Sequence, residues 1–266
     1  MPATDSAAGV SVYYETHGDG PPLILLSGTG HDCNFWSRQL PFFTPAYTVI
    51  TVDNRGVGRT IVPNHDYSLA DMADDAAAVL AAEGIAAAHV MGFSQGGHIA
   101  QELALRHPGK VLSLGIHHSW ARMCPRLRDF QTLRKILAEK GDRDTLVRVS
   151  LLALHAPEYY RSAGDGMVAH HEFLVENSPP NEGWVGQLGA CLASDTWNRL
   201  GHISVPTLVT TSRFDLTVPS YHSHEIAGAI PGAEFVMLED SGHVALMETP
   251  EAFAKVCLEF LDRQAA

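Results

Sequence analysis

Short, β-rich apolar runs alternate with longer helical segments along the whole chain. We expect strands at residues 10–16, 22–27, 47–53, 88–93, 111–117, 206–212 and 234–239. The clearest helical patterns between them lie at residues 68–84 and 95–106. Because buried strands that alternate with helices pack as a mostly parallel sheet covered on both faces, the pattern predicts an α/β fold with flanking helices.

The first of these helices has recognisable ends. Ser68 can accept a hydrogen bond from the start of the helix, and Asp71, three residues later, completes a capping box. Gly84 can adopt the left-handed backbone that commonly ends a helix. These residues predict a helix between Ser68 and Gly84.

The interval from residue 121 to residue 200 departs from the alternation. It is helix-rich, includes the stretch R-L-R-D-F-Q-T-L-R-K-I-L, and shows no convincing strand. A surface insertion without a function would look the same. Its length and its place between strands favour a helical cap over a site at the strand ends. We therefore predict a core of residues 1–120 and 201–266 and a helical cap of residues 121–200.

Composition limits the partners of the chain. It has 266 residues, of which 45% are hydrophobic and 18% charged, so it can bury a sizeable core. Its 18 Lys and Arg residues are outnumbered by 30 Asp and Glu residues, which gives a formal net charge of −12. This charge repels phosphate backbones and anionic lipids on average, so we expect neither a nucleic-acid partner nor a membrane partner.

The sequence also indicates a compartment. Its first ten residues, M-P-A-T-D-S-A-A-G-V, contain neither a basic nor an apolar signal region, and no run reaches the ~18 apolar residues of a membrane span. The four cysteines are scattered and form no C-x-x-C pair. Free thiols suit a reducing compartment, so we expect a cytoplasmic protein.

A serine lies between two glycines where a predicted strand meets a predicted helix. The stretch is Gly92-Phe93-Ser94-Gln95-Gly96. Such a sharp corner places its central residue in a strained backbone, and small neighbours let the helix pass close to the strand. The hydroxyl of Ser94 is then exposed at the N-terminal end of the helix dipole. The motif predicts a nucleophile at Ser94.

A serine hydroxyl becomes a good nucleophile only when a base removes its proton. His243 follows the last predicted strand, and Asp215 follows the strand at 206–212. Loops at the carboxyl ends of parallel strands reach the same edge of a sheet. We therefore predict that Asp215 orients His243 and that His243 activates Ser94. Asp240 competes with Asp215, but its position so near His243 in the sequence favours a role in shaping the loop.

The order Ser94, Asp215, His243, with each residue on a loop after a strand, resembles that of the α/β hydrolases. The likeness covers nearly the whole chain. It includes the stretches L-S-G-T-G, D-N-R-G-V-G-R, G-F-S-Q-G-G and S-G-H-V-A-L-M-E-T-P-E. The resemblance implies the α/β-hydrolase fold, a mostly parallel central sheet flanked by helices with a helical cap insertion.

The resemblance also implies an oxyanion hole. In such enzymes one donor is the backbone N–H of the residue after the nucleophile, here Gln95. The other donor comes from the loop after the strand at 22–27, where Thr29 is the matching residue. Family members often carry histidine where this chain has Ser27, which leaves the packing of this loop open. A plain glycine-rich turn is the alternative interpretation.

Residues 53–59 form a second glycine-rich stretch, D-N-R-G-V-G-R. It lacks the Gly-Lys-Ser/Thr of a P-loop and the glycine spacing of a Rossmann fold, so we do not expect it to bind phosphate. We interpret it as a turn in which Asp53 and Arg55 hold the core together.

Two further stretches resemble small-molecule hydrolases, among them the 3-oxoadipate enol-lactonases and the aminoacrylate hydrolases of pyrimidine breakdown. They are L-L-S-G-T-G with F-W-S-R-Q-L, and H-S-W-A-R. This resemblance implies a small carboxylic ester, a lactone or a related acyl C–N bond as the substrate.

Aromatic residues near these stretches are candidates for an apolar pocket. Trp120 stands where a strand ends and the insertion begins, which favours a place in the pocket. Trp36, Phe93 and Trp184 are further candidates, and core packing is the alternative for each. We predict a substrate pocket lined by Trp36, Phe93 and Trp120.

Arg122 and Arg126 closely follow Trp120 in the sequence. A guanidinium group can bind a carboxylate through two parallel hydrogen bonds, so either arginine could hold a carboxylate of the substrate. Exposure to solvent on the cap is the alternative. Of the two, we place Arg122 among the substrate-binding candidates.

Four histidines occur as two adjacent pairs, His117 with His118 and His170 with His171. Adjacent side chains of a strand point to opposite faces, so the spacing does not favour a shared metal ion. We expect neither a metal nor a cofactor.

Together these features predict a serine hydrolase that forms an acyl-enzyme on Ser94. Two alternatives stay open. A lyase or a cofactor-free oxygenase of the same fold would use His243 and Asp215 to abstract a proton, and a ligand receptor would keep the three residues without turnover. We expect a small molecule as the partner. The sequence leaves the oligomeric state open, a homodimer included.

Overall fold

The computed structural model describes residues 3–5, 9–63 and 66–264. Within them, eight strands form one sheet in the order β1-β2-β4-β3-β5-β6-β7-β8. Strands β3 to β8 are parallel to one another, whereas β2 is antiparallel to both β1 and β4. The strand bounds are β1 Ala3–Asp5, β2 Ser11–His17, β3 Pro22–Leu26, β4 Thr48–Val52, β5 Ala88–Phe93, β6 Val111–His117, β7 Thr207–Ser212 and β8 Glu234–Leu238.

All seven strands predicted from the sequence are confirmed, as β2 to β8. The strand that the sequence did not predict is β1, a three-residue segment at the edge of the sheet that pairs with β2. The letters A-T-D carry no apolar alternation, so the pairing depends on the neighbouring strand and not on a local pattern.

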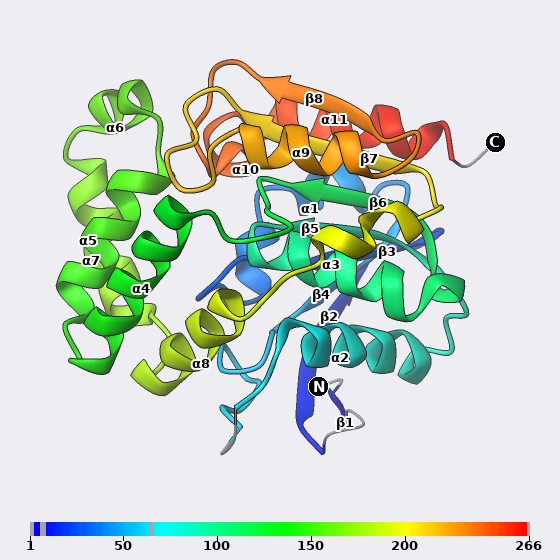
Figure 1. Cartoon of the computed structure of the whole chain (residues 1–266), viewed down its shortest axis with the longest axis horizontal. Helices are drawn as coiled ribbons and strands as arrows, with labels where there is room; N and C mark the ends of the chain where they lie inside the picture. The colour runs from blue at the N-terminus through cyan, green and yellow to red at the C-terminus, as the bar shows by residue number, and fades with distance from the viewer. Residues whose placement is uncertain (1–2, 6–8, 64–65, 265–266) are drawn as a thin grey trace.

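Helices cover both faces of this sheet (Figure 1). The α-helices outside the insertion are α1 Leu40–Phe43, α2 Leu69–Ala82, α3 Gln95–Arg106, α9 Tyr221–Ala229, α10 Ala245–Glu248 and α11 Pro250–Asp262. Three short 3-10 helices lie at η1 Cys33–Trp36, η2 Pro108–Lys110 and η3 Trp197–His202.

Strand β3 shows how one sequence fills both layers of the core. Leu23 and Leu25 pack in a cluster with residues of α11, whereas Ile24 and Leu26 pack in a cluster with residues of α2 and α3. Successive side chains of a strand point to opposite faces, so a continuous apolar run such as P-L-I-L-L is buried on both sides. This explains why β3 is apolar at every position and does not alternate with polar residues.

The predicted helix boundaries of α2 are confirmed by its hydrogen bonds. The Ser68 hydroxyl accepts from the Asp71 backbone N–H (3.2 Å), and the Asp71 carboxylate accepts from the Ser68 backbone N–H (2.7 Å). Gly84 follows the end of the helix with φ +68°, in the left-handed region. The capping box and the glycine therefore fix both ends of α2.

Five helices are inserted between β6 and β7, all of them within residues 121–200, and we call them the cap helices. They are α4 Pro125–Glu139, α5 Arg143–Leu154, α6 Pro157–Ala163, α7 Gly166–Asn177 and α8 Asn181–Leu192. In Figure 1, α4 to α7 stand together at one side of the sheet and α8 leads back toward the core. The two connecting segments lie side by side, because the Thr196 backbone N–H donates to the Ala121 carbonyl (2.9 Å).

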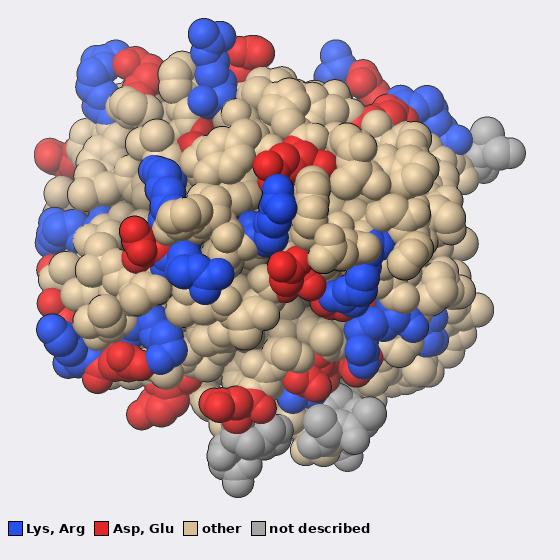
Figure 2. Space-filling view, viewed as in Figure 1, with Lys and Arg blue, Asp and Glu red and all other residues tan. Residues whose placement is uncertain are grey.

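The surface carries charges of both signs. On the face shown in Figure 2, acidic and basic side chains are interspersed. Among the residues that the structure describes, no helix is long and apolar enough to cross a bilayer.

The turn at residues 53–59 is held by two buried acidic groups, which confirms its interpretation as a structural turn. Asp53 accepts hydrogen bonds from the backbone N–H groups of Cys33 (2.7 Å) and Arg59 (2.8 Å). Arg55 forms a bidentate pair with Asp75 of α2, with Nε–Oδ2 at 2.6 Å and Nη2–Oδ1 at 2.9 Å. Both side chains of this pair are almost fully buried, so it ties the turn to α2.

Removal of one partner of this pair should destabilise the fold. The change Asp75→Ala leaves a buried guanidinium unpaired, and we expect the free energy of unfolding to fall by about 3–5 kcal/mol. Asp74→Ala is the matched control on the same helix, because Asp74 pairs with Arg106 near the surface; there we expect a loss of about 1 kcal/mol or less. Urea denaturation of both variants measures the difference, and equal losses would contradict it.

Candidate active site

Ser94 occupies the corner between β5 and α3. Its backbone angles are φ 55° and ψ −115°, and it is one of two non-glycine residues with positive φ in the described chain. A non-glycine residue is strained in this region, and such strain is concentrated at functional sites. The Ser94 N–H donates to the His117 carbonyl (2.8 Å), and the Ser119 hydroxyl donates to the Ser94 carbonyl (2.7 Å). The neighbours of β5 thus hold the corner in place.

Two glycines allow this corner to form. A Cβ atom on Gly92 would lie 2.0 Å from the Gly96 carbonyl oxygen, and a Cβ on Gly96 would lie 2.0 Å from the Leu26 carbonyl oxygen. The start of α3 therefore passes against the backbones of β5 and β3, where only glycine fits. This is the close approach that the sequence predicts for a nucleophile on a strand-to-helix turn.

His243 and Asp215 come together at the carboxyl ends of β8 and β7. His243 Nδ1 donates to Asp215 Oδ2 at 2.7 Å, and both side chains are 2% exposed or less. The other carboxylate oxygen, Oδ1, accepts from the backbone N–H groups of Thr217 (2.9 Å) and Val218 (2.7 Å). These bonds fix the carboxylate and leave Nε2 of His243 as the free ring nitrogen.

Ser94 and His243 line the same narrow cavity. No hydrogen bond joins the side chains of these two described residues. Hydrogen bonds of this kind commonly tighten only when a substrate is bound, and both groups already face the space that a substrate would enter. The ring of Phe93 packs edge-on against His243, with centroids 5.4 Å apart, and supports the imidazole from the core side.

The two predicted oxyanion donors lie in different places relative to Ser94. Thr29 follows β3 and lines the cavity with Ser94, and Gln95 is the first residue of α3. Within the part of the chain that the structure describes, neither backbone N–H has an acceptor. Gln95 lacks one because the first N–H groups of a helix have no intrahelical partner. Both residues thus keep an unpaired backbone donor, as the oxyanion hole implied by the resemblance requires.

Ser27 replaces the expected histidine without disrupting the oxyanion loop. The residue is fully buried, and its hydroxyl donates to the Asp32 carbonyl (3.2 Å). Its own carbonyl accepts from the Asn54 side chain (3.2 Å). The loop is therefore held by a small hydroxyl and an amide in place of an imidazole.

A cap helix also supports the oxyanion loop. Gln187 of α8 accepts from the Gly30 backbone N–H through Oε1 (2.7 Å) and donates to the Arg55 carbonyl through Nε2 (2.9 Å). Gly30 has φ +80°, and a Cβ atom there would lie 2.2 Å from the ring of Trp184. The insertion thus contributes directly to the shape of the candidate site.

Of the three aromatic residues predicted to line the substrate pocket, only one lies at the cavity. Phe93 lines the cavity beside Ser94. Trp36 and Trp120 are fully buried in the two core clusters, and the Trp120 indole donates to the Ser194 hydroxyl (3.1 Å). Neither tryptophan lines the cavity, because the apolar layers of the sheet enclose both.

Arg122 also lies away from Ser94. Its guanidinium stacks over Trp197, 4.1 Å from the ring centroid, and forms an ion pair with Glu225 at 3.5 Å. Its side chain is 46% exposed, and Arg126 is exposed as well. The structure therefore brings neither arginine to the cavity.

A third arginine, Arg134 of α4, does line the cavity, although the sequence did not single it out. It shares the buried face of α4 with Leu127, Gln131 and Ala138, at a spacing typical of a core-facing helix. Burial lowers the pKa of Arg134 to about 10. One sequence feature could have pointed to Arg134: it is an arginine at a position where the helical spacing predicts a buried apolar residue.

The cavity is small, about 20 Å³, and it adjoins a much larger cleft of about 670 Å³ between the core and the cap helices. The two share the lining residues His31, Phe35, Leu154 and Val244. The cleft therefore leads from the surface to the narrow cavity at Ser94, in the way that binding sites for small molecules commonly do.

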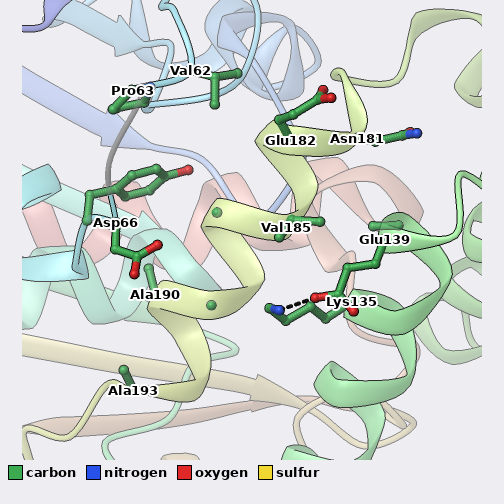
Figure 3. Close-up of a pocket in the computed structure, with 14 residues that line it drawn as sticks. Val62, Pro63, Asp66, Lys135, Glu139, Asn181, Glu182, Val185, Ala190 and Ala193 are labelled. Carbon is green, nitrogen blue, oxygen red and sulfur yellow. Dashed lines mark hydrogen bonds and ion pairs between the residues drawn. The ribbon is translucent and has the colours of Figure 1, made fainter.

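A separate hollow of about 800 Å³ lies on the other side of α8, between α4 and the residues Val62, Pro63, Asp66 and Tyr67 (Figure 3). The ion pair of Lys135 and Glu139 lies on its wall. None of the predicted site residues lines it.

The comparisons with known proteins agree with this geometry. A family model described as the alpha/beta hydrolase fold matches residues 21–250. The chain belongs to the α/β hydrolase fold family. The strand order, the helical insertion after β6 and the corner at Ser94 are thus those of a hydrolase fold, as the sequence predicts.

Individual α/β hydrolases are similar over nearly the full length. A relative from Azorhizobium caulinodans, provisionally named carbamate hydrolase RutD, is 34% identical over 250 residues, which are 94% of each chain. The enol-lactonase from Burkholderia xenovorans LB400 superposes with a TM-score of 0.90 at 25% identity, over 98% of this chain and 100% of that one. A thermophilic esterase from Thermogutta terrifontis, solved with malate bound, gives 0.89 at 25% identity, over 100% and 99%.

A second carboxylate, which the sequence did not reveal, secures the loop of His243. Glu248 of α10 accepts from the Gly242 backbone N–H (2.9 Å), from the Ala156 backbone N–H (3.2 Å) and from His155 Nδ1 (3.0 Å). Its side chain is 1% exposed. Because Ala156 and His155 belong to the cap segment between α5 and α6, this carboxylate joins the insertion to the loop that carries His243.

The adjacent histidines of β6 point to different partners. His117 bonds the Thr210 hydroxyl (2.9 Å), and His118 bonds the Ser212 hydroxyl (2.7 Å). Burial lowers the pKa of His117 to about 3 and that of His118 well below its usual value, so both are neutral near pH 7. Across the described residues, no group of three or more His, Cys, Asp or Glu side chains is placed to hold a metal ion.

The close packing of Gly92 against the start of α3 can be tested by substitution. The change Gly92→Ala forces a Cβ atom against the Gly96 carbonyl, so we expect the free energy of unfolding to fall by about 2–3 kcal/mol or more. Gly109→Ala is the control, since a Cβ there meets nothing within 4 Å. Thermal unfolding of the two variants measures the contrast; a Gly92→Ala protein as stable as the control would show that the corner is not tightly packed.

Proposed function

We propose that the protein is a serine hydrolase that cleaves a small carboxylic ester, a lactone or a related acyl C–N bond through an acyl-enzyme on Ser94. The observation that carries the proposal is the buried His243–Asp215 hydrogen bond at the wall of a cavity shared with the strained Ser94. The provisional carbamate hydrolase and the enol-lactonase support the substrate classes, since each is named for cleavage at an acyl carbon.

The first half of the reaction forms the acyl-enzyme. Ser94 Oγ attacks the acyl carbon while His243 Nε2 takes the hydroxyl proton. Asp215 holds the imidazole by the bond to Nδ1 and stabilises its charged form. The backbone N–H groups of Thr29 and Gln95 bind the oxyanion. His243 then gives its proton to the leaving oxygen or nitrogen, and the bond to the leaving group breaks.

The second half restores the enzyme. His243 takes a proton from water, and the hydroxide attacks the ester carbon on Ser94. The oxyanion again lies against the two backbone donors. When the tetrahedral intermediate collapses, the carboxylic acid leaves and the proton returns to Ser94 Oγ.

A covalent intermediate separates this mechanism from proton abstraction by a lyase or an oxygenase. With a slowly hydrolysed ester, we expect the mass of one acyl group to appear on the peptide that contains Ser94. Ser94→Ala should lose the label and at least about 10³-fold of ester turnover. Ser204→Ala is the control, because Ser204 is exposed and is not among the residues that line the cavity. Mass spectrometry after rapid quenching makes the measurement, and unchanged turnover in Ser94→Ala would rule the mechanism out.

The role of Asp215 gives a second test. In Asp215→Asn, the remaining carbonyl oxygen can still accept from Thr217 and Val218, while the amide group turns a donor toward His243 Nδ1. The imidazole then adopts the wrong tautomer, and we expect kcat to fall by about 10³-fold or more with the fold retained. Steady-state kinetics together with the circular dichroism spectrum measure both effects. A small loss of kcat in a folded variant would contradict the assigned role.

A further inference from the structure

A buried guanidinium faces the cavity of Ser94. Arg134 is only 6% exposed. Its Nε donates to the Ser150 hydroxyl (3.1 Å) and its Nη1 to the Gln131 side chain (2.9 Å). Its Nη2 has no partner among the residues that the structure describes. Since Arg134 lines the cavity together with Ser94 and Thr29, an unused pair of N–H donors is available there.

No carboxylate of the described residues forms an ion pair with the Arg134 guanidinium. The other fully buried arginine, Arg55, is paired with Asp75 through two hydrogen bonds. The partners of Arg134 are a hydroxyl and an amide, both neutral. A buried charge without a counterion is costly, so an anion that binds at Arg134 would offset this cost.

Two aromatic rings orient the guanidinium. Its central carbon lies 5.1 Å from the ring centroid of Trp184 and 5.5 Å from that of Phe130. These contacts, with the bonds to Ser150 and Gln131, hold the planar group in one position. A fixed guanidinium is suited to bind a carboxylate, because its donors match the two carboxylate oxygens.

The charged residues that line the cleft and the cavity favour an anionic ligand. The protein has a formal net charge of −12. Among the described residues, the charged side chains that line the cleft and the cavity are nevertheless Arg38, Arg134 and a single acid, Asp32. Asp32 is bonded to the backbone and side chain of Asn34 (2.9 and 3.1 Å), which occupies both of its oxygens. The site is thus more cationic than the protein that surrounds it.

The position of Arg134 indicates which half of the substrate carries the anion. Arg134 lines the narrow inner cavity and is not among the residues that line the outer cleft. The leaving group must depart through the cleft while the acyl group remains on Ser94. A ligand group at Arg134 therefore belongs to the acyl half.

We propose that Arg134 binds a carboxylate on the acyl part of the substrate, so that the protein prefers short acyl compounds that carry a second, anionic group. This inference rests on the proposed function, because it assigns the acyl half from the acyl-enzyme on Ser94. It makes Arg134 a specificity-determining residue of the cap.

Two methyl esters of matched size test the preference. Methyl hydrogen succinate carries the carboxylate, and methyl pentanoate replaces it with an apolar end. We expect kcat/KM to be at least about tenfold higher for the succinate ester, and Arg134→Gln to lower the ratio of the two values by about 10- to 100-fold. Arg128→Gln is the control, since Arg128 lies on the same helix and is exposed; it should leave the ratio unchanged. Acid release at constant pH measures all rates.

Calorimetric binding of succinate to the intact protein tests the carboxylate site without turnover. We expect the wild type to bind succinate and Arg134→Gln to bind at least about tenfold more weakly. Arg134→Lys keeps the charge without the planar fork, and should lie between the two; it replaces Arg134→Gln if thermal unfolding shows that the glutamine variant does not fold.

The outcomes separate the two proposals. If the wild type binds succinate through Arg134 but cleaves neither ester, ester hydrolysis is wrong and the carboxylate site stands. If the wild type cleaves methyl pentanoate at least as well as the succinate ester, or Arg134→Gln slows both equally, the carboxylate site is wrong and hydrolysis stands. Failure of the wild type to bind succinate overturns the carboxylate site in either case.

Discussion

The geometry of the site depends on how closely α3 passes the backbones of β3 and β5. With glycine at positions 92 and 96, the helix begins almost in contact with both strands, and Ser94 is lifted above the sheet edge. Because α3 begins at Gln95, the N–H of this residue has no intrahelical acceptor, so the start of the helix also leaves an unpaired donor next to Ser94 in the sequence. The strain at Ser94 is sustained by bonds from neighbouring strands and not by the corner itself.

The cap helices contribute to the core at two places. Gln187 ties α8 to the loop of Thr29, and Glu248 ties the segment between α5 and α6 to the loop of His243. The insertion therefore contacts the loop of Thr29 and the loop of His243, and it adds Arg134 to the cavity wall. An inserted segment with these contacts determines the shape of the site as well as covering it.

Much of the fold and part of the site could be predicted from the sequence, because their signals are local. The strands are compact apolar runs, and Ser94, Asp215 and His243 each lie just beyond such a run. Arg134 and Glu248 could not be found this way, since both act through tertiary contacts with residues distant in the sequence. For Trp120 and Arg122 the prediction was wrong. Both lie near a strand end in the sequence, but this nearness does not determine the direction in which each side chain points.

The bond between Gln187 and Gly30 makes the insertion part of the support of a core loop. Gly30 is the neighbour of Thr29 in the sequence, so a displacement of α8 would pass through this bond to the backbone that carries Thr29. Substitutions far from Ser94, on the face of α8 that contacts the core, should therefore change the surroundings of Ser94 without touching a ligand.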